Sequence, residues 1–142
     1  MSRYRIVGVT LLMCAVAPAG IAAAVGPAVP GSTVAVPGGF YTNVWPAVLA
    51  QMLAKKDFAF INVHVPYEGE IRGTDGHIPY DQVEARIREF PADRAAPIVL
   101  YCRSGTMSAT AAETLVRLGY TRVFNLAGGF LAWGQAGYLV KP

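Results

Sequence analysis

The feature that most constrains the fold is an apolar, β-branched run that ends in a single cysteine and continues into an alanine-rich stretch. The run covers Ile98 to Tyr101, the cysteine is Cys102, and the alanine-rich stretch extends to Leu118. The run has the length and composition of a buried strand, and the later stretch has the periodicity of a helix. A short polar loop containing Gly105 separates them. The sequence therefore predicts a strand, a turn and a helix, with a sulfur atom at the turn.

The predicted turn is a favourable place for a negative charge. Backbone N–H groups in the first turn of a helix have no partner inside the helix and carry a partial positive charge. In this arrangement they point back at Cys102, and Arg103 adds a full positive charge beside it. We therefore expect the thiolate form of Cys102 to be favoured, as in reactive cysteines. The alternative is a cysteine that only fills space in the core, but such a residue needs no glycine-containing loop after it.

The loop closely resembles the active-site loop of the rhodanese family, single-domain sulfurtransferases that carry a sulfane sulfur as a cysteine persulfide. The matching pattern, Cys-Arg-Ser-Gly-x-x-Ser, runs from Cys102 to Ser108. The chain agrees with the family in three further segments, which stand in the family's order at residues 60–64, 76–79 and 125–133. The resemblance covers Tyr41 to Tyr138. It implies an α/β fold, a three-layer α/β/α domain with a mainly parallel central sheet of about five strands.

By this resemblance Cys102 is the catalytic nucleophile. We expect backbone N–H groups of the loop to hold the terminal sulfur of its persulfide, because converging N–H groups bind a small anion without a side-chain clamp. The loop residues expected to bind the persulfide or the substrate are Arg103, Ser104, Gly105, Thr106 and Met107. Arg72 is a further candidate for contacting an anionic donor, because in the family the polar connection at 66–76 flanks the cysteine pocket. The alternative for Arg72 is an ordinary surface arginine.

The resemblance implies a double displacement through Cys102. Its thiolate attacks the sulfane sulfur of a donor such as thiosulfate, releases sulfite, and holds a persulfide until cyanide, a thiol or a protein cysteine takes the sulfur. The loop is one residue shorter than in the related cysteine phosphatases and arsenate reductases and lacks their closing arginine, so phosphoryl and arsenate chemistry are disfavoured. No cofactor is expected. A metal site from His64, His77 and Cys102 is disfavoured because no close-spaced ligand pair supports it.

Three positions depart from the commonest family pattern. Asn62 and His64 stand where Asp and Arg are common, and Met107 stands where many members carry a cation. We expect weaker thiosulfate binding than in relatives with a cationic loop, which leaves a small persulfide or a protein as an alternative donor. His64 is expected either to pair with Glu68 or Glu70 or to sit in the loop without a partner. These departures keep open a second function, a non-catalytic or weakly active binding module that docks to an exported partner.

The N-terminal region has the pattern of a secretory signal peptide. A short basic segment at residues 1–5 precedes an almost wholly apolar run at 6–21, and the alanines at 22–24 supply the small residues of a cleavage site. We therefore expect residues 1–24 to be a signal peptide and the protein to be exported, either periplasmic or secreted.

Two other fates of this segment stay open. An uncleaved membrane anchor is one, because the apolar character continues toward Val29 and approaches the roughly 20 residues that a spanning helix needs. Membrane contact is expected only in that case. Lipidation at Cys14 is the other, although bulky Met13 stands where lipoproteins carry a small residue. If Cys14 leaves with the signal, Cys102 is the only remaining thiol, which favours a chemical use or deep burial.

The remaining chain is long enough for one core and too short for two domains. Residues 25–40 are rich in proline and glycine and are expected to form a linker without helix or sheet, followed by the rhodanese-like domain at 41–142. The chain has twelve Lys and Arg, or ten without Arg3 and Arg5, against nine Asp and Glu. The exported part is therefore close to neutral and has no basic stripe, which excludes nucleic-acid binding.

Hydrophobic periodicity predicts the other elements of the domain. The expected strands cover 58–63, 98–101 and 123–126. The expected helices are one capped by Thr42 or Asn43 that ends near Lys56, one from Tyr80 to Phe90, one from the cysteine loop to Leu118, and a short one carrying Trp133. The side chains of Trp45, Met52 and Trp133 are expected in the core.

Overall fold

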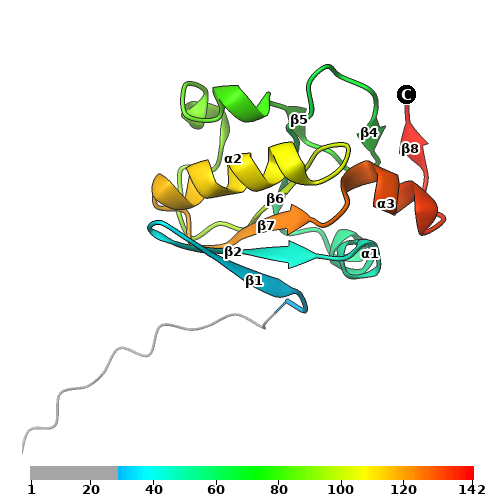
Figure 1. Ribbon diagram of the computed structural model, residues 1–142, viewed down its shortest axis with the longest axis horizontal. Helices are drawn as coiled ribbons and strands as arrows, with labels where there is room; N and C mark the ends of the chain where they lie inside the picture. The colour runs from blue at the N-terminus through cyan, green and yellow to red at the C-terminus, as the bar shows by residue number, and fades with distance from the viewer. Residues whose placement is uncertain (1–28) are drawn as a thin grey trace, which may run out of the picture.

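The computed structural model describes residues 29–142, and its central feature is a six-stranded sheet in the order β1-β2-β7-β6-β3-β5 (Figure 1). In this spatial order, the strands β2, β7, β6, β3 and β5 are parallel to their neighbours, and within this sheet only the edge strand β1 is antiparallel to the strand beside it. The strands are β1 (Ser32–Val36), β2 (Gly39–Val44), β3 (Ala59–Asn62), β5 (Gly76–His77), β6 (Ile98–Tyr101) and β7 (Val123–Leu126). The predicted signal peptide lies outside the described residues.

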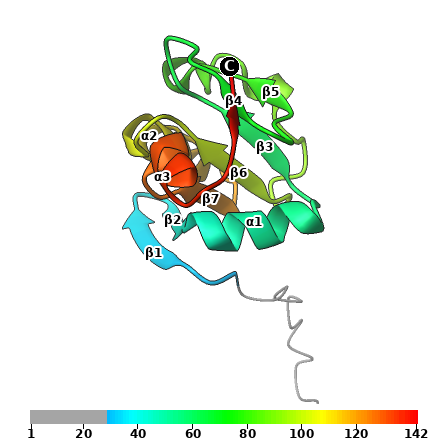
Figure 2. The same cartoon turned by 90° about the vertical axis from the view of Figure 1, so that its right-hand side faces the viewer.

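Helices cover both faces of this sheet (Figure 1 and Figure 2). They are α1 (Pro46–Ala54), α2 (Thr106–Arg117) and α3 (Gly129–Gln135), and a small antiparallel pair, β4 (Glu70–Ile71) with β8 (Val140–Lys141), stands beside the main sheet. Successive strand residues point to opposite faces. In β3, Ile61 therefore joins the core under α2, while Phe60 joins the core under α1 and α3. The predicted three-layer α/β/α fold is confirmed.

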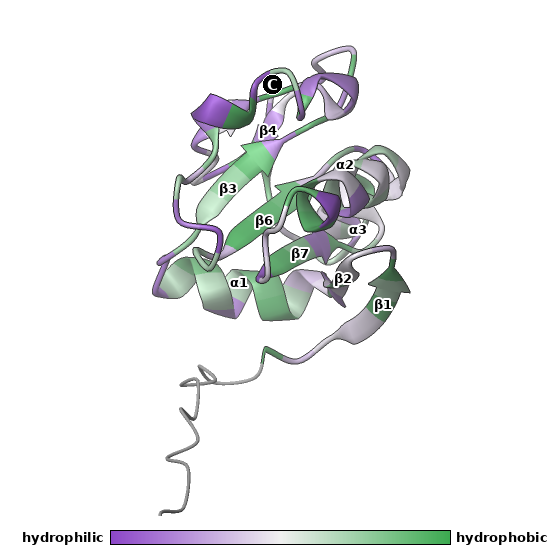
Figure 3. Ribbon diagram, turned by 90° about the vertical axis from the view of Figure 1, so that its left-hand side faces the viewer, coloured by the Kyte–Doolittle hydropathy of each residue, from purple (hydrophilic) through white to green (hydrophobic). Residues whose placement is uncertain are grey.

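The two central strands are buried along their whole length. Every residue of β6 and of β7 is buried, and both ribbons are largely green, the colour of hydrophobic residues (Figure 3). Strands covered by helices on both faces read as continuous apolar runs. For this reason these two strands and β3 can be predicted correctly from the sequence. It also means that the cysteine that follows β6 is attached to a rigid, buried strand.

The prediction that residues 25–40 contain no sheet is wrong. β1 and β2 form a hairpin in which Val36 pairs with Gly39 across a turn at Pro37 and Gly38. Pro30 and Pro37 stand outside the two strands, so neither removes an N–H group from the ladder. Gly38 has a φ of +94°, which glycine adopts without strain. The sheet therefore begins before the position predicted for the start of the domain.

The predicted helix from Tyr80 to Phe90 is also wrong. The segment forms two 3₁₀ turns, Tyr80–Gln82 and Ile87–Glu89, separated by residues 83–86. The helix is interrupted at Arg86, which has a φ of −107° and a ψ of 24°. Val83 and Phe90 are both buried in the core under α2. Packing of these two side chains outweighs helix propensity over so short a segment.

The start of α1 differs from the prediction as well. Thr42 and Asn43 belong to β2, and the helix begins at Pro46 without a side-chain cap. Trp45, expected in the core, is 50% exposed. Its backbone is extended (φ −85°, ψ 159°), so its side chain does not follow the face of α1 that buries Leu49. Trp133 in α3 is buried, as predicted.

A buried tyrosine ties β4 to the main sheet. The hydroxyl of Tyr101 accepts a hydrogen bond from the Ile71 N–H at 3.0 Å and lies 2.7 Å from Thr74 Oγ1, which donates to the Ile71 carbonyl at 2.6 Å. The ring is fully buried. Burial raises the pKa of Tyr101 to about 12 from its ordinary value of 10.0, which means that the folded protein favours the neutral hydroxyl.

We expect Tyr101→Phe to lower the free energy of unfolding by about 1–3 kcal/mol, because the buried Ile71 N–H loses its acceptor. Urea denaturation at pH 7 measures this. Since the folded pKa of Tyr101 is raised, its contribution to stability is complete below pH 10 and declines as the pH rises through about 12. The variant should lack that part of the alkaline decline. Tyr67→Phe, at a half-exposed ring, is the control, and an equal loss of stability in both variants would contradict the assignment.

Candidate active site

Cys102 lies at the carboxyl end of the central strand β6, where parallel sheets place their sites. The residue is 1% exposed. The chain turns at Gly105, which has a φ of +97°, and α2 begins at Thr106. A Cβ atom at Gly105 would lie 3.1 Å from the Gly128 nitrogen, so both conformation and space favour glycine here. The predicted arrangement of strand, cysteine, turn and helix is confirmed.

Two hydrogen-bond donors face the sulfur, one from the loop and one from α2. The Gly105 N–H donates to Cys102 Sγ at 3.1 Å, and Ser108 Oγ lies 3.4 Å from the same sulfur. Ser108 Oγ also lies 3.2 Å from the Gly105 carbonyl, so its single proton serves one of these acceptors at a time. The first N–H groups of α2 have no partner inside the helix, and they add partial positive charge on this side of the sulfur. The site is suited to hold a negative charge on or beside the sulfur.

Ser108 was not among the predicted binding residues, although the matched loop pattern ends on it. Its side chain is fully buried on the face of α2 that packs on the sheet, with Ala111, Ala112 and Leu115. A serine on such a face needs a polar partner, because an unpaired buried hydroxyl costs free energy. That polar residue within an apolar helix face was the signal in the sequence.

The remaining loop residues differ in their surroundings. Arg103, Ser104 and Thr106 are exposed, and Ser104 Oγ lies 3.5 Å from Thr106 Oγ1. Met107 is partly buried and packs against the core under α2. All the predicted loop residues lie around Cys102 because they follow it directly in the chain. Within the described residues, Gly105 is the one whose backbone N–H donates a hydrogen bond to the sulfur.

The first residues of α3 hold the cysteine loop from the other side. The Phe130 N–H donates to the Cys102 carbonyl at 3.0 Å, and the Leu131 N–H donates to the Arg103 carbonyl at 3.1 Å. Gly129, with a φ of +59°, allows this approach: a Cβ atom there would lie 2.3 Å from the Cys102 carbonyl oxygen. The loop backbone is therefore fixed by α2 and by α3 together.

Glu68 connects the loop after β3 with the cysteine loop. His64 Nε2 lies 2.6 Å from one oxygen of its carboxylate, and Arg103 donates to the other at 3.5 Å. Of the two alternatives for His64, pairing with Glu68 is the one observed. The guanidinium of Arg103, the nearest full positive charge to Cys102 along the chain, thus has a carboxylate beside it, which reduces its attraction for an anionic donor.

The uncharged Asn62 keeps its place through backbone hydrogen bonds. Its amide donates to the Gly69 carbonyl at 3.0 Å, and its side-chain oxygen accepts from the His64 N–H at 3.0 Å. His77 Nε2 lies 2.6 Å from the His64 carbonyl, so His77 helps to shape the same loop. Among residues 29–142, no group of three or more His, Cys, Asp and Glu side chains is placed to hold a metal ion.

Arg72 stands apart from this group. It follows β4 and lines a hollow between α1 and the segment around α3, and none of the residues lining that hollow belongs to 102–108. The structure does not bring Arg72 to the cysteine loop, because β4 pairs with β8 and directs the turn after it toward α1. In the part of the chain that the structure describes, no helix has the length and apolar character needed to cross a membrane.

The fold and the cysteine loop define the class of the protein. The chain belongs to the rhodanese-like domain family, whose pattern matches residues 46–136.

Particular relatives share most of this domain. A protein of Allochromatium vinosum named sulfurtransferase is 38% identical over 99 residues, which cover 66% of this chain and 90% of the relative. The thiosulfate sulfurtransferase GlpE of Pseudoalteromonas translucida is 32% identical over 95 residues, 64% of this chain and 86% of the relative. The crystal structure of a rhodanese-related protein from Thermoplasma volcanium is 27% identical, covers 69% of this chain and 95% of that one, and superposes with a TM-score of 0.58.

We expect Gly129→Ala to lower the free energy of unfolding by about 1–3 kcal/mol, because the added Cβ would collide with the Cys102 and Arg103 carbonyls and the φ of this residue strains other side chains. Thermal or urea unfolding measures this. The matched control is Gly134→Ala in the same helix, where a Cβ meets nothing within 4 Å; it should leave stability unchanged or raise it by about 0.5–1 kcal/mol. Equal stability of the two variants would show that the close approach of α3 does not matter.

Proposed function

We propose that this protein is an exported enzyme that transfers a sulfane sulfur from thiosulfate or a persulfide donor to a thiol, cyanide or protein-cysteine acceptor, through a persulfide on Cys102. The chain is a rhodanese-type sulfurtransferase, as its family and its sulfurtransferase relatives indicate. The observation that carries the proposed intermediate is the sulfur of Cys102 facing the Gly105 N–H and the Ser108 hydroxyl at the end of the central strand.

The proposed reaction has two displacements. In the first, the Cys102 thiolate attacks the outer sulfur of thiosulfate; the sulfur–sulfur bond of the donor breaks, and sulfite leaves with its electron pair. In the second, the acceptor attacks the outer sulfur of the persulfide, and Cys102 leaves as thiolate. The Gly105 N–H and the Ser108 hydroxyl lie where they stabilise this thiolate, and the unpaired N–H groups at the start of α2 suit the anionic outer sulfur.

The first test is the intact mass of the purified protein before and after thiosulfate, and then after cyanide. We expect a gain of one sulfur atom with thiosulfate and its loss with cyanide, because a persulfide donates its outer sulfur to a strong nucleophile. Cys102→Ser should show neither change while remaining folded by circular dichroism. A reduced protein that takes up no sulfur from thiosulfate or from a small persulfide would instead favour the alternative, a binding module of the same fold.

The charge around the loop leads to a second prediction, which concerns the binding of the sulfur donor thiosulfate. With Met107 in the loop and Glu68 beside Arg103, the site offers little net positive charge to thiosulfate. We expect Met107→Arg to lower the KM for thiosulfate about two- to fivefold, the effect of one added charge near the surface. Steady-state kinetics at low and high salt measures it, and the gain should shrink at high salt. Met107→Leu, which changes the side chain without adding charge, is the control; an equal fall in KM would refute the electrostatic explanation.

The proposal of export rests on the basic, apolar and small-residue regions at residues 1–24. Sequencing the N-terminus of the protein isolated from soluble and membrane fractions tests it. We expect a soluble protein that begins at or near Val25. An intact N-terminus in the membrane fraction would show that the segment is an anchor, and a soluble cytosolic protein with an intact N-terminus would contradict export.

A further inference from the structure

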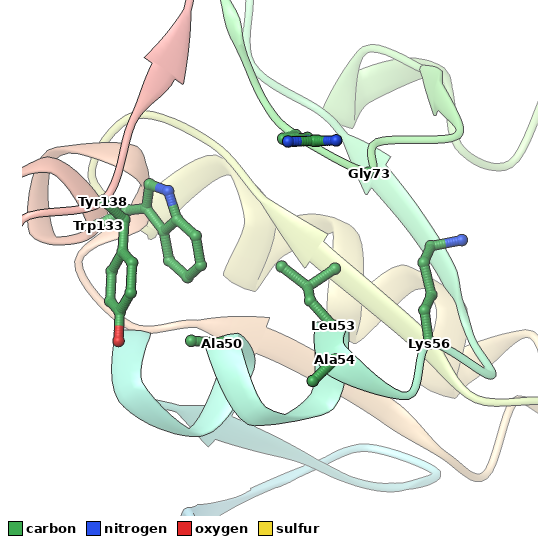
Figure 4. A pocket seen from close by; sticks show the side chains of 8 residues that line it. Ala50, Leu53, Ala54, Lys56, Gly73, Trp133 and Tyr138 are labelled. Atoms are coloured by element: carbon green, nitrogen blue, oxygen red, sulfur yellow. The ribbon is translucent and has the colours of Figure 1, made fainter.

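A hollow of about 420 Å³ lies between α1 and the segment that includes α3 and the residues after it (Figure 4). Trp133 and Tyr138 lie at one end of it and Lys56 at the other, with Ala50 and Leu53 of α1 between them. The volume falls within the range of small-molecule sites, about 300–1,000 Å³. None of the residues lining it belongs to the cysteine loop, so it is a site distinct from that of sulfur transfer.

The walls of this hollow are mainly apolar and partly rigid. The rings of Trp133 and Tyr138 stack with their centroids 4.3 Å apart and their planes at 26°. The Trp133 indole N–H donates to the Leu139 carbonyl at 3.1 Å, which fixes the ring further. Stacked aromatic rings opposite the aliphatic side chains of α1 form a surface suited to an acyl chain or an aromatic ring.

The charged residues that line the hollow are two cations, Lys56 and Arg72, and no carboxylate is among the lining residues. Lys56 Nζ lies 2.7 Å from the Asp75 carboxylate and is neutralised by it. The Arg72 guanidinium is different: within residues 29–142 no hydrogen bond or ion pair involves its side chain. Arg72 therefore offers five N–H donors and a full charge beside an apolar hollow.

We propose that this hollow binds a small amphipathic carboxylate, with the apolar body of the ligand against Leu53 and Trp133 and its carboxylate on Arg72. A planar guanidinium pairs with a carboxylate through two parallel hydrogen bonds. A neutral molecule of the same length would gain only the apolar contacts, and a cationic one would be repelled by Arg72. The charge of the ligand head is therefore the distinguishing property of the site.

The indole N–H signal of Trp133 in a proton–nitrogen correlation spectrum is a direct probe. The chain has two tryptophans, and Trp45→Phe removes the other signal. We expect octanoate to shift the Trp133 signal in a saturable way, octanol to bind several-fold more weakly, and octylammonium to bind least. In Arg72→Gln, octanoate should bind about five- to tenfold more weakly, as expected for the loss of a charge-assisted hydrogen-bonded pair.

Two further variants make this test specific. Arg88→Gln removes another exposed arginine, which does not line the hollow, and should leave octanoate binding unchanged. Ala50→Phe should fill the space and abolish binding while the spectrum stays that of the folded protein. The proposal is overturned if octanoate gives no saturable shift of the Trp133 signal, if octanol binds as tightly as octanoate, or if Arg72→Gln and Arg88→Gln bind octanoate equally.

Discussion

The hydrogen bonds from the start of α3 to the cysteine loop are the interaction on which the site depends. A loop whose donor at Gly105 faces a buried sulfur leaves its own carbonyls in need of donors, since unpaired buried carbonyls are costly. Phe130 and Leu131 supply those donors to Cys102 and Arg103. Because a glycine at position 129 is needed for this contact, the last helix of the domain and the central strand form one unit around the sulfur.

The parts of the fold that could be predicted from the sequence are those with local signals. The four-residue apolar run of β6, with the cysteine and the glycine that follow it, can be recognised as a strand and a turn from its own residues. The buried face of α2 can be recognised in the same way from its periodicity. The hairpin of β1 and β2, the exposure of Trp45 and the two 3₁₀ turns after Tyr80 depend on packing between distant residues. The residues within those segments do not indicate which distant residues they will contact.

The candidate site shows the same division. Its loop residues follow one another in the chain, so their grouping around Cys102 could be predicted, whereas Glu68 was expected only as one possible partner of His64. Its bond to Arg103 joins residues 35 positions apart, and no spacing rule reveals such a pair. Arg72 was assigned to the sulfur site by its loop alone, and the pairing of β4 with β8 directs it elsewhere.

In the proposed reaction, the burial of Cys102 restricts which molecules can take the sulfur from it. A side chain that is 1% exposed cannot meet a flat protein surface, and the proposed persulfide would extend it by only about 2 Å, the length of one sulfur–sulfur bond. A protein acceptor must therefore present its own cysteine on a narrow projection, such as a chain end or a protruding loop. This requirement of shape does not apply to small thiols and cyanide. The burial of the sulfur thus selects acceptors by their shape, independently of their chemical reactivity.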